Sequence, residues 1–557
     1  MQEPDHQLTQ SERLIGYVDD AELFHTPDGE AHATLTVNGH KETWPLKSKR
    51  FKQWLLRRFY KELGKAPSAQ ALTDALATIA ARAIFDGPEK TVHVRVAGHG
   101  DDTVYLDLCN EPWEVVEITP SGWRIVSSKA VPVKFVRMDN AAPLPYPTRG
   151  GTVESLKRFL NVESDEDYML FVAWLIGTFN PDGPYPILVL QGEQGSAKST
   201  TVRVARSITD PAVEPLRAPP RSERDLAIAA SGNWTPALDN LSGIRPWLSD
   251  ALCRLATGGG FATRELYSDD REVLFSHKRP VIVNGIDTLA VAGDFRDRSI
   301  IIELPPIPSD ERRTEKTLYR ALERARPKVL GALLDAVSAA LGNLDRVELK
   351  QKPRMPDFAV WVAAAEEALG WEHGAFMRAH IGNRAEANEI ALANDPVAEA
   401  LRRVVDRHGE LSGTTTELLG VLSTEVSDQI KRSKSWPAAP NSLSNKLNRL
   451  APALREAGIE FDEDRTGHDR TRIKTLRKSE QEIVRTVRTD DEHTGDGSSS
   501  HGPSEDHADE EKRFAGEPYP GVSLPEIVAN GRPTGPADDA DGESQSLSKN
   551  ERMEFDI

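Results

Sequence analysis

The sequence has little cysteine and no long hydrophobic run. Cys109 and Cys253 are the only two cysteines in 557 residues, and they lie too far apart in sequence to form a metal-binding pair. The longest apolar stretch, residues 168–179, is too short to cross a bilayer and contains Gly177. The N-terminus is acidic and polar, unlike a secretory signal. We therefore expect a cytoplasmic protein without a zinc site or a membrane partner.

Positive charge is also scarce, because 69 Lys and Arg stand against 87 Asp and Glu and give a net charge of −18. From residue 477 onward, 20 acidic residues face 9 basic ones, in a segment rich in Ser, Gly and Pro. Such a segment cannot bury enough apolar surface to offset its ordering entropy, so we predict a disordered acidic tail over residues 477–557. The rest of the chain is only mildly acidic, and its charge does not exclude DNA binding.

A chain of this length is expected to form several domains. We predict that residues 1–12 are disordered and that residues 13–148 form an α+β accessory domain. Short alternating apolar runs between residues 92 and 136 favour antiparallel strands. Helices are expected at residues 51–63 and 69–85 of the same domain.

The proline-rich residues 142–147 predict a linker between the accessory domain and the next domain. A helix is then expected at residues 166–179, with Ser164 as its N-terminal cap. Strands and helices alternate after it, which predicts a central α/β core over residues 150–305. Residues 306–395 are expected to form a helical segment.

The most informative pattern is an apolar run at residues 187–190, followed by a glycine-bearing turn and a Lys-Ser pair that opens a helix. The turn lets backbone N–H groups point inward, and the positive end of the helix dipole faces the same place. Lys198 is placed to reach the β- and γ-phosphates of ATP, and the Ser199 hydroxyl to bind Mg²⁺. The predicted nucleotide-binding loop comprises Gly192, Glu193, Gln194, Gly195, Ser196, Ala197, Lys198, Ser199 and Thr200.

One residue departs from the usual phosphate-loop pattern, since Ala197 stands where glycine normally precedes the lysine. Alanine tolerates a helical φ/ψ, but its methyl group lies where the backbone meets phosphate. The alternative interpretation is a strand–helix turn without a ligand.

Two further strands end in polar residues that suit the same site. Asp239 follows a short strand and could bind Mg²⁺ directly or through water; the alternative is a cap or turn residue. Asn240 stands where many such ATPases have Glu, and an amide orients a water but cannot act as a general base. Asn284 ends another buried strand and could hold the attacking water, although Asn-Gly by itself predicts only a turn.

Two arginines precede the last strand of the core. An arginine that reaches the γ-phosphate of a neighbouring subunit stabilises the charge that spreads during phosphoryl transfer. We take Arg298 as the first candidate and Arg296 as the second. The alternative for both is a surface salt bridge.

In this order, the motifs resemble those of the superfamily 3 helicase ATPases, within them the phage and plasmid primase–helicase proteins. The resemblance rests on residues 192–200, on Leu238 to Asn240, and on residues 257–267 with the strand 281–284 after them. It implies a P-loop (AAA+-like) ATPase that forms a homo-oligomer, a hexameric ring, with ATP at subunit interfaces and single-stranded DNA in its centre. No primase metal motif is found in residues 1–148.

The resemblance also implies a hairpin over residues 262–275 that grips single-stranded DNA. Asp269 and Asp270 stand at its tip, where related helicases often have Lys or His, which puts the gripping role in doubt. Arg264, Arg271 and Lys278 are the candidate DNA contacts that remain.

Residues 396–476 predict a C-terminal winged helix. Thr414 and Glu417 form a capping box, and leucines recur on one face of a second helix at residues 441–454. Two strands around a polar turn come after it. The candidate DNA-binding residues are Lys431, Arg432, Lys434, Asn445, Lys446, Asn448, Arg449, Arg472 and Lys474. The alternative is a small helical interaction domain, which the acidic residues 462–464 would suit.

Together these features predict an ATP-driven DNA helicase or translocase of a phage, plasmid or integrated mobile element, acting in DNA replication. A second hypothesis is a DNA-binding initiator or regulator whose ATP site controls only its assembly. A third is an inactive nucleotide-binding scaffold, against which Lys198, Ser199 and Asp239 argue.

Overall fold

The computed structural model describes residues 8–259, 261–264, 272–275, 278–286, 293–466 and 471–479. The predicted acidic tail falls almost entirely outside these ranges. The first helix, α1 (Gln10–Gly16), begins after Thr9, whose hydroxyl and the Glu12 carboxylate form a capping box. The expectation of disorder through residue 12 was therefore wrong from Gln10 onward.

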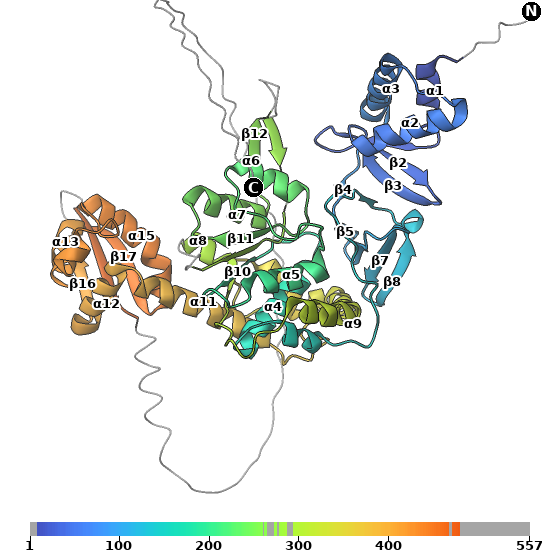
Figure 1. Cartoon of the computed structure of the whole chain (residues 1–557). Helices are drawn as coiled ribbons and strands as arrows, with labels where there is room; N and C mark the ends of the chain where they lie inside the picture. The colour runs from blue at the N-terminus through green and yellow to red at the C-terminus, as the bar shows by residue number, and fades with distance from the viewer. Residues whose placement is uncertain are drawn as a thin grey trace, which may run out of the picture. The chain divides into compact units, whose positions relative to one another are not determined.

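The N-terminal part of the chain packs three helices on a small antiparallel sheet (Figure 1). The sheet has the order β1-β2-β3, with β1 (Glu22–His25), β2 (Ala31–Val37) and β3 (His40–Pro45). The helices after it are α2 (Lys49–Leu63) and α3 (Ala69–Ala81), followed by a π-helical turn, Arg82–Asp86. Phe51, Leu55 and Phe59 of α2 are fully buried in this core. The two longer helices agree with the sequence prediction, whereas the three strands were not predicted.

A second antiparallel sheet comes next, with the order β5-β6-β7-β8. Its strands are β5 (Val96–His99), β6 (Thr103–Asp107), β7 (Glu114–Thr119) and β8 (Gly122–Ser127), and a short pair, β4 (Val92–His93) and β9 (Lys134–Phe135), lies beside them. Leu106 and Val116 belong to the same buried cluster as the central region. This sheet is thus fused to the central core, unlike the first sheet.

The proline-rich segment packs against its neighbours along much of its length. Leu144 is buried, and its N–H donates to the Leu108 carbonyl (2.9 Å). The Thr148 N–H donates to the Pro327 carbonyl (2.9 Å). The predicted linker is therefore a packed connection.

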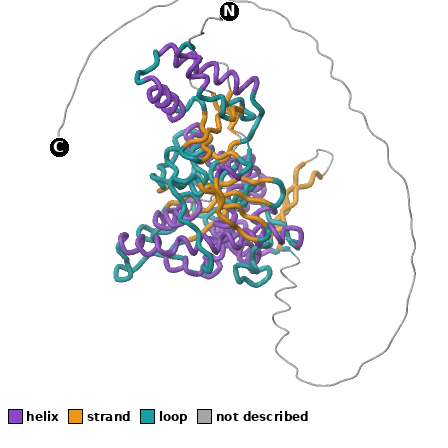
Figure 2. The backbone as a smooth tube through the Cα atoms, turned by 90° about the vertical axis from the view of Figure 1, so that its right-hand side faces the viewer, coloured by secondary structure: helices purple, strands orange, loops and turns teal. Residues whose placement is uncertain are grey.

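The central region holds a four-stranded parallel sheet, as the sequence predicted. Its order is β11-β14-β10-β15, with β10 (Ile187–Gln191), β11 (Ala237–Leu241), β14 (Ile282–Gly285) and β15 (Ser299–Glu303). Every residue of β10 is buried, as expected for a strand covered on both faces. Figure 2 shows these strands surrounded by helices.

The helices of the central region begin with a 3-10 segment, Val153–Phe159. They continue with α4 (Asp165–Gly177), α5 (Lys198–Thr209), α6 (Glu223–Ser231), α7 (Pro246–Thr257) and α8 (Gly293–Arg296). Ser164 caps α4 by accepting from the Asp167 N–H (3.0 Å), as predicted. None of the helices within the described ranges is both long enough and apolar enough to cross a membrane.

The expected hairpin is present as β12 (Phe261–Arg264) and β13 (Glu272–Phe275), which pair antiparallel from Phe261 with Phe275 to Arg264 with Glu272. The two strands project away from the parallel sheet in Figures 1 and 2. The predicted tip, with Asp269, Asp270 and Arg271, lies outside the described residues.

After the sheet, the chain is helical as predicted, with α9 (Glu315–Asn343), a 3-10 turn (Leu344–Arg346), α10 (Pro356–Ala363) and α11 (Ala375–Ala393). The C-terminal module is next along the chain. It contains α12 (Pro396–His408), β16 (Glu410–Gly413), α13 (Thr415–Thr424), α14 (Asp428–Lys431), α15 (Pro440–Glu456), β17 (Ile459–Thr466) and β18 (Thr471–Lys478).

Both signals that predicted the C-terminal module are present in the structure. The capping box joins Thr414 and Glu417 at the start of α13, and Leu443, Leu447 and Leu454 of α15 are fully buried. Strand β18 pairs with both β16 and β17. Helix α12 and strand β16 were not predicted, and they complete an arrangement of four helices and three strands around one apolar core.

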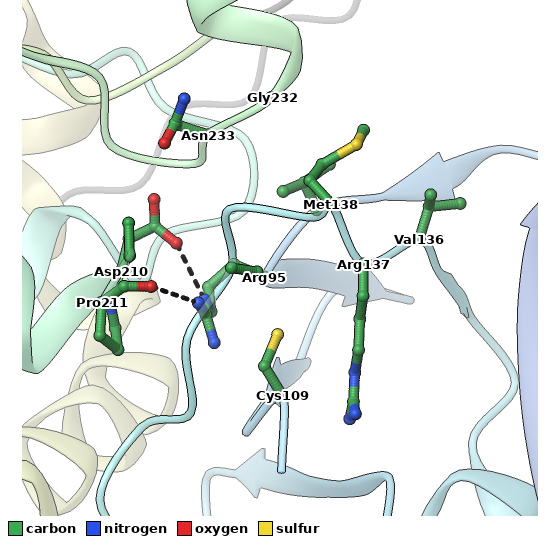
Figure 3. A pocket seen from close by; sticks show the side chains of 12 residues that line it. Arg95, Cys109, Val136, Arg137, Met138, Asp210, Pro211, Gly232 and Asn233 are labelled. Carbon is green, nitrogen blue, oxygen red and sulfur yellow. Dashed lines mark hydrogen bonds and ion pairs between the residues drawn. The ribbon is translucent and has the colours of Figure 1, made fainter. Parts of the chain in front are cut away.

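A buried arginine joins the second sheet to the central region. Figure 3 shows Arg95, just before β5, reaching toward Asp210 and Pro211 at the end of α5. Its guanidinium is 1% exposed; Nε donates to Asp210 Oδ1 (3.0 Å), and Nη2 donates to the Ala142 and Pro211 carbonyls (3.0 and 3.2 Å). Asp210 also accepts from Arg206 of α5 (3.0 Å) and from the Thr235 N–H before β11 (3.0 Å). The network thus connects the end of helix α5 with the segment that enters strand β11, and both elements carry residues of the predicted nucleotide site.

Candidate nucleotide-binding site

The loop between β10 and α5 has the backbone that a phosphate-binding turn requires. Gly192 has φ 145°, and a Cβ there would lie 2.3 Å from the Leu304 carbonyl, so no other residue fits without a shift. Gly195 has φ 87°. Helix α5 begins at Lys198, and its free N–H groups and positive dipole end therefore face the loop.

Ala197 lies in the left-handed region, with φ 64° and ψ 26°. The sequence expectation was that alanine would sit here in a helical conformation, and that expectation was wrong. The position has the geometry for which glycine is normally used, because a Cβ is disfavoured at positive φ. The loop therefore keeps the usual backbone shape at a cost in local strain.

Lys198 folds back over the loop. Its ammonium donates to the carbonyls of Gly192 (2.8 Å) and Glu193 (2.6 Å) and to the Ser196 hydroxyl (3.3 Å). Burial lowers the pKa of Lys198 from its ordinary value, and the nearby Asp239 carboxylate acts in the opposite direction. These carbonyls hold the lysine at the mouth of the loop, where a phosphate oxygen could replace them.

Strand β14 lies between β10 and β11, so the polar residues at their carboxyl ends meet. The Ser199 hydroxyl donates to Asp239 Oδ1 (2.8 Å), and Asn284 Nδ2 donates to the same oxygen (2.6 Å). Asn284 Oδ1 accepts from the Asn240 N–H (2.7 Å), and Asn240 has φ 59° at a break in the β11 register. The sequence order of these residues predicted this meeting, and the exposed Asn240 side chain lies at its edge.

The chemistry of these side chains fits Mg²⁺. A serine hydroxyl and one carboxylate are the oxygen ligands that Mg²⁺ takes from a protein when phosphate and water supply the rest. Within the described residues, no group of three or more His, Cys, Asp and Glu side chains could hold a metal by itself. Ser199 and Asp239 would therefore hold the ion together with a bound nucleotide.

Two residues that sequence reasoning missed brace the loop. Asn161 Nδ2 donates to the carbonyls of Ser196 (3.2 Å) and Pro305 (2.6 Å), joining the loop to the segment after β15. Arg312 comes back to the same loop, with a guanidinium nitrogen 3.4 Å from where a Cβ on Gly195 would lie. Neither residue carries a local motif, since their partners are distant in sequence.

The two candidate arginines differ in their surroundings. Arg298 is 13% exposed, and it pairs with the Asp294 carboxylate and donates to the Asp294 carbonyl (3.0 Å). Arg296 is buried, and its Nε donates to Asn388 Oδ1 (3.0 Å). Burial lowers the pKa of Arg296. Arg296 is therefore engaged in packing within the chain, and Arg298 is the more exposed of the two candidates.

The candidate DNA contacts on the hairpin are only partly described. Arg264 is the last residue of β12, and Arg271 lies outside the described residues. Lys278 is exposed, and its ammonium donates to the Asp182 carbonyl (2.8 Å).

The candidate DNA-binding residues of the C-terminal module fall into two groups. Lys474 is 1% exposed, pairs with Glu463 and donates to Asn448 Oδ1 (3.2 Å), and Lys446 pairs with Asp395 (3.0 Å). These two ammonium groups are engaged within the module. The exposed group, which a DNA backbone could reach, comprises Lys431, Arg432, Lys434, Asn445, Arg449 and Arg472, of which Lys431 pairs with Asp428 and Arg472 with Glu463.

The fold and site define a multidomain mixed α/β protein with a central parallel sheet and a glycine-bearing loop at the end of its β10 strand. The family model of the actinomycete integrative conjugative element replication protein matches residues 153–386, and that of the AICE RepA C-terminal domain matches residues 397–493. Together they span more than half of the chain, and the chain belongs to this family of replication proteins. Residues before 153 lie outside both matches.

Solved structures of a C-terminal region of NrS-1 are similar to the chain. The A form of the apo structure matches at 14% identity and a TM-score of 0.37, over 85% of this chain and 99% of that one. An apo structure of its residues 305–718 matches at 13% identity and a TM-score of 0.36, over 85% and 100%. None of the curated proteins matches the chain.

Proposed function

We propose that this replication protein is an ATP-hydrolysing DNA motor, a helicase or translocase that works in the replication of its element. The observation that carries the proposal is the meeting of Ser199, Asp239 and Asn284 beside the loop that holds Lys198. Asp239 and Asn284 lie near the ends of two strands of one sheet, and Ser199 lies in the first turn of the helix after a third. Together they supply a cation, a carboxylate and a water-orienting amide, which are the groups that phosphoryl transfer from ATP uses.

The proposed mechanism rests on these contacts. Backbone N–H groups of the loop and the first turn of α5 bind the phosphates, and Lys198 exchanges its carbonyl partners for phosphate oxygens. Mg²⁺, held by Ser199 and Asp239, supplies charge neutralisation on the phosphates. Asn284 orients the attacking water. Asp239 is the carboxylate that would accept a proton from this water, because the Asn240 amide cannot act as a base.

The proposed assembly is a homo-oligomer, hexameric by its family resemblance, with single-stranded DNA in the ring and duplex DNA at the C-terminal module. Arg298 from one subunit would reach the γ-phosphate held by the next and stabilise the transferring group. Exposed Arg432, Lys434 and Arg449 would contact the duplex backbone.

The test is an ATPase assay with and without DNA, combined with a strand-separation assay, on the wild type and on Lys198→Ala. We expect DNA to stimulate hydrolysis, and the variant to lose hydrolysis and unwinding by about 100-fold or more while it still binds DNA. Lys350→Ala, which removes an exposed lysine outside the site, should behave as the wild type. A hydrolysis rate indifferent to DNA, together with no unwinding, would exclude a motor.

A second candidate function is an initiator whose ATP site controls assembly without unwinding. Asn240 favours it, because a site with one fewer carboxylate is suited to slow hydrolysis. The same lysine variant separates the two functions. An assembly switch would lose oligomerisation or DNA binding itself, which a mass measurement with and without ATP would detect.

A further inference from the structure

Helix α2 of the N-terminal part carries an unusual number of exposed cations. With a period of 3.6 residues, Lys49, Arg57 and Lys61 fall on the side opposite the buried Phe51, Leu55 and Phe59, whereas Lys52 lies next to the buried side. All four cations are exposed, and Lys47 and Lys65 flank them before and after the helix. The only acidic residue of α2, Glu62, lies toward the inner side, where it pairs with Arg13 (3.0 Å) and accepts from the Tyr17 hydroxyl (2.6 Å).

These four cations of α2 are unpaired within the described part of the chain. No carboxylate there lies within ion-pair distance of Lys49, Lys52, Arg57 or Lys61. In contrast, the other two arginines of the helix have partners in the N-terminal part of the chain. Arg50 binds Glu42 (2.7 Å), and Arg58 donates to the Tyr17 carbonyl (2.8 Å) and stacks over the Trp54 ring.

This charge arrangement opposes the stability of the isolated helix. The first turn of α2 holds no acidic residue but holds Lys49, Arg50 and Lys52, although the positive end of the helix dipole favours anions there. Arg57 and Lys61 are like charges at i and i+4, which repel each other. The chain has a net charge of −18, yet this face is positive, and its cations repel one another and the helix dipole. An anionic partner would remove this repulsion.

The face also presents an aromatic ring. Tyr60 lies among the cations and is 61% exposed. A helix of 15 residues is about 22 Å long, enough to follow several phosphates of a nucleic-acid backbone. Cations interleaved with an aromatic ring suit phosphates and the bases or sugars between them.

We propose that the outward face of α2, formed by Lys49, Arg57, Tyr60 and Lys61, is a nucleic-acid-binding surface separate from the ring and from the C-terminal module. It gives the N-terminal part of the chain a role in holding DNA. The surface lies outside both family matches and does not depend on nucleotide hydrolysis. It therefore stands even if the proposed motor activity fails.

The first test measures DNA binding by the full chain without nucleotide, using fluorescence anisotropy over a range of salt. The variant is Lys49→Gln/Arg57→Gln/Lys61→Gln. We expect about tenfold weaker binding at low salt and a salt slope of log K that is less steep by about 2 to 3, one for each phosphate that the variant no longer neutralises. Single-stranded and duplex probes of equal length show which form the face prefers.

The matched control is Lys350→Gln/Lys352→Gln/Arg354→Gln, which removes the same three charges from an exposed connection before α10. It should bind DNA with wild-type affinity and slope. Equal effects of the two variants would overturn the proposal, because the weaker binding would then reflect net charge. Unchanged DNA binding with lost binding to phosphatidylserine vesicles would also overturn it in favour of a membrane surface.

The second test locates the contact. Ultraviolet cross-linking to DNA that contains 5-bromodeoxyuridine, followed by peptide mapping, should label Tyr60. Phe85, which is 83% exposed in the same part of the chain, is the control ring and should not be labelled. Labelling of Phe85 to the same degree, or none at Tyr60, would contradict the proposal.

Discussion

At the residue scale, backbone strain marks the nucleotide site. Six residues other than glycine have a positive φ in the described part of the chain: Asn38, Arg95, Cys109, Trp113, Ala197 and Asn240. Ala197, at the start of helix α5, and Asn240, in strand β11, flank the candidate site. Strained residues persist where the surrounding structure holds them in place, and such places are often functional. Here the strain sets the direction of the loop N–H groups and of the Asn240 N–H.

The strain at Ala197 is testable. We expect Ala197→Gly to raise the free energy of unfolding by about 0.5 to 1 kcal/mol. Alanine has a steric penalty at φ 64° that glycine lacks, and this penalty exceeds the entropy cost of ordering glycine. Urea unfolding followed by tryptophan fluorescence measures the change. Ala205→Gly, in the interior of the same helix, is the control and should lower stability by about 1 kcal/mol. A loss at both positions would show that Ala197 is unstrained.

Part of the site could be predicted residue by residue. Asp239 and Asn284 lie near the carboxyl ends of β11 and β14, Lys198 and Ser199 open the helix after β10, and parallel strands bring such ends to one edge of a sheet. Asn161 could not be predicted, because it binds carbonyls 35 and 144 residues away and no local pattern marks it. The pairing of Arg298 with Asp294 was also open, since a sequence does not show which partner an arginine takes.

At the element scale, the Arg95 network connects the second sheet to the nucleotide site. Helix α5 carries Lys198 at its start and precedes Asp210 at its end, while Thr235 leads into the strand that carries Asp239. Burial alone would raise the pKa of Asp210, but Arg95 and Arg206 outweigh it and hold that pKa below its ordinary value. The carboxylate therefore stays charged, and it fixes both elements against the sheet that precedes them.

Removing this connection should be costly. We expect Arg95→Met to lower the free energy of unfolding by about 3 kcal/mol, because Asp210 keeps its buried charge and loses a fully buried partner. In Arg95→Met/Asp210→Asn the loss should be smaller than the sum of the two single losses.

The control for the Arg95 network is Arg124→Met in the neighbouring strand β8. Arg124 pairs with Glu117, but its side chain is 74% exposed, so the change should cost much less than Arg95→Met. Urea unfolding measures all four variants against the wild type. Additive losses in the Arg95 cycle would show that the two side chains do not act together.

Elements with a strong apolar period or a clear cap were predictable. Helices α2, α4 and α15 and the strands of the parallel sheet fall close to their expected ranges. Strand β2 was missed although apolar and polar side chains alternate along it, because two of its apolar positions, Ala31 and Ala33, are alanines, which favour strands only weakly. Helix α12 was missed although Asp395 caps it and Pro396 opens it, because the proline was taken only as a boundary.

At the scale of the whole molecule, negative and positive charges are concentrated in different parts of the chain. Acidic residues accumulate in the C-terminal 81 residues, whereas α2 and the exposed part of the C-terminal module keep their cations. The total charge of a protein therefore says little about its affinity for DNA, which depends on local surfaces. The proposed nucleotide site also depends on more than one chain, because Arg298 would come from another copy of the protein.

That shared site predicts complementation between two inactive variants. Lys198→Ala lacks the loop lysine and Arg298→Ala lacks the proposed contact to the next subunit, so each alone should be nearly inactive. In randomly mixed rings at equal amounts, about a quarter of the interfaces combine an intact Lys198 with an intact Arg298 and should regain hydrolysis. A mixture of Lys198→Ala with Asp239→Ala is the control, because both groups belong to the same subunit and no interface is restored. If the first mixture also remains inactive while mass measurement shows mixed rings, Arg298 acts only within its own subunit.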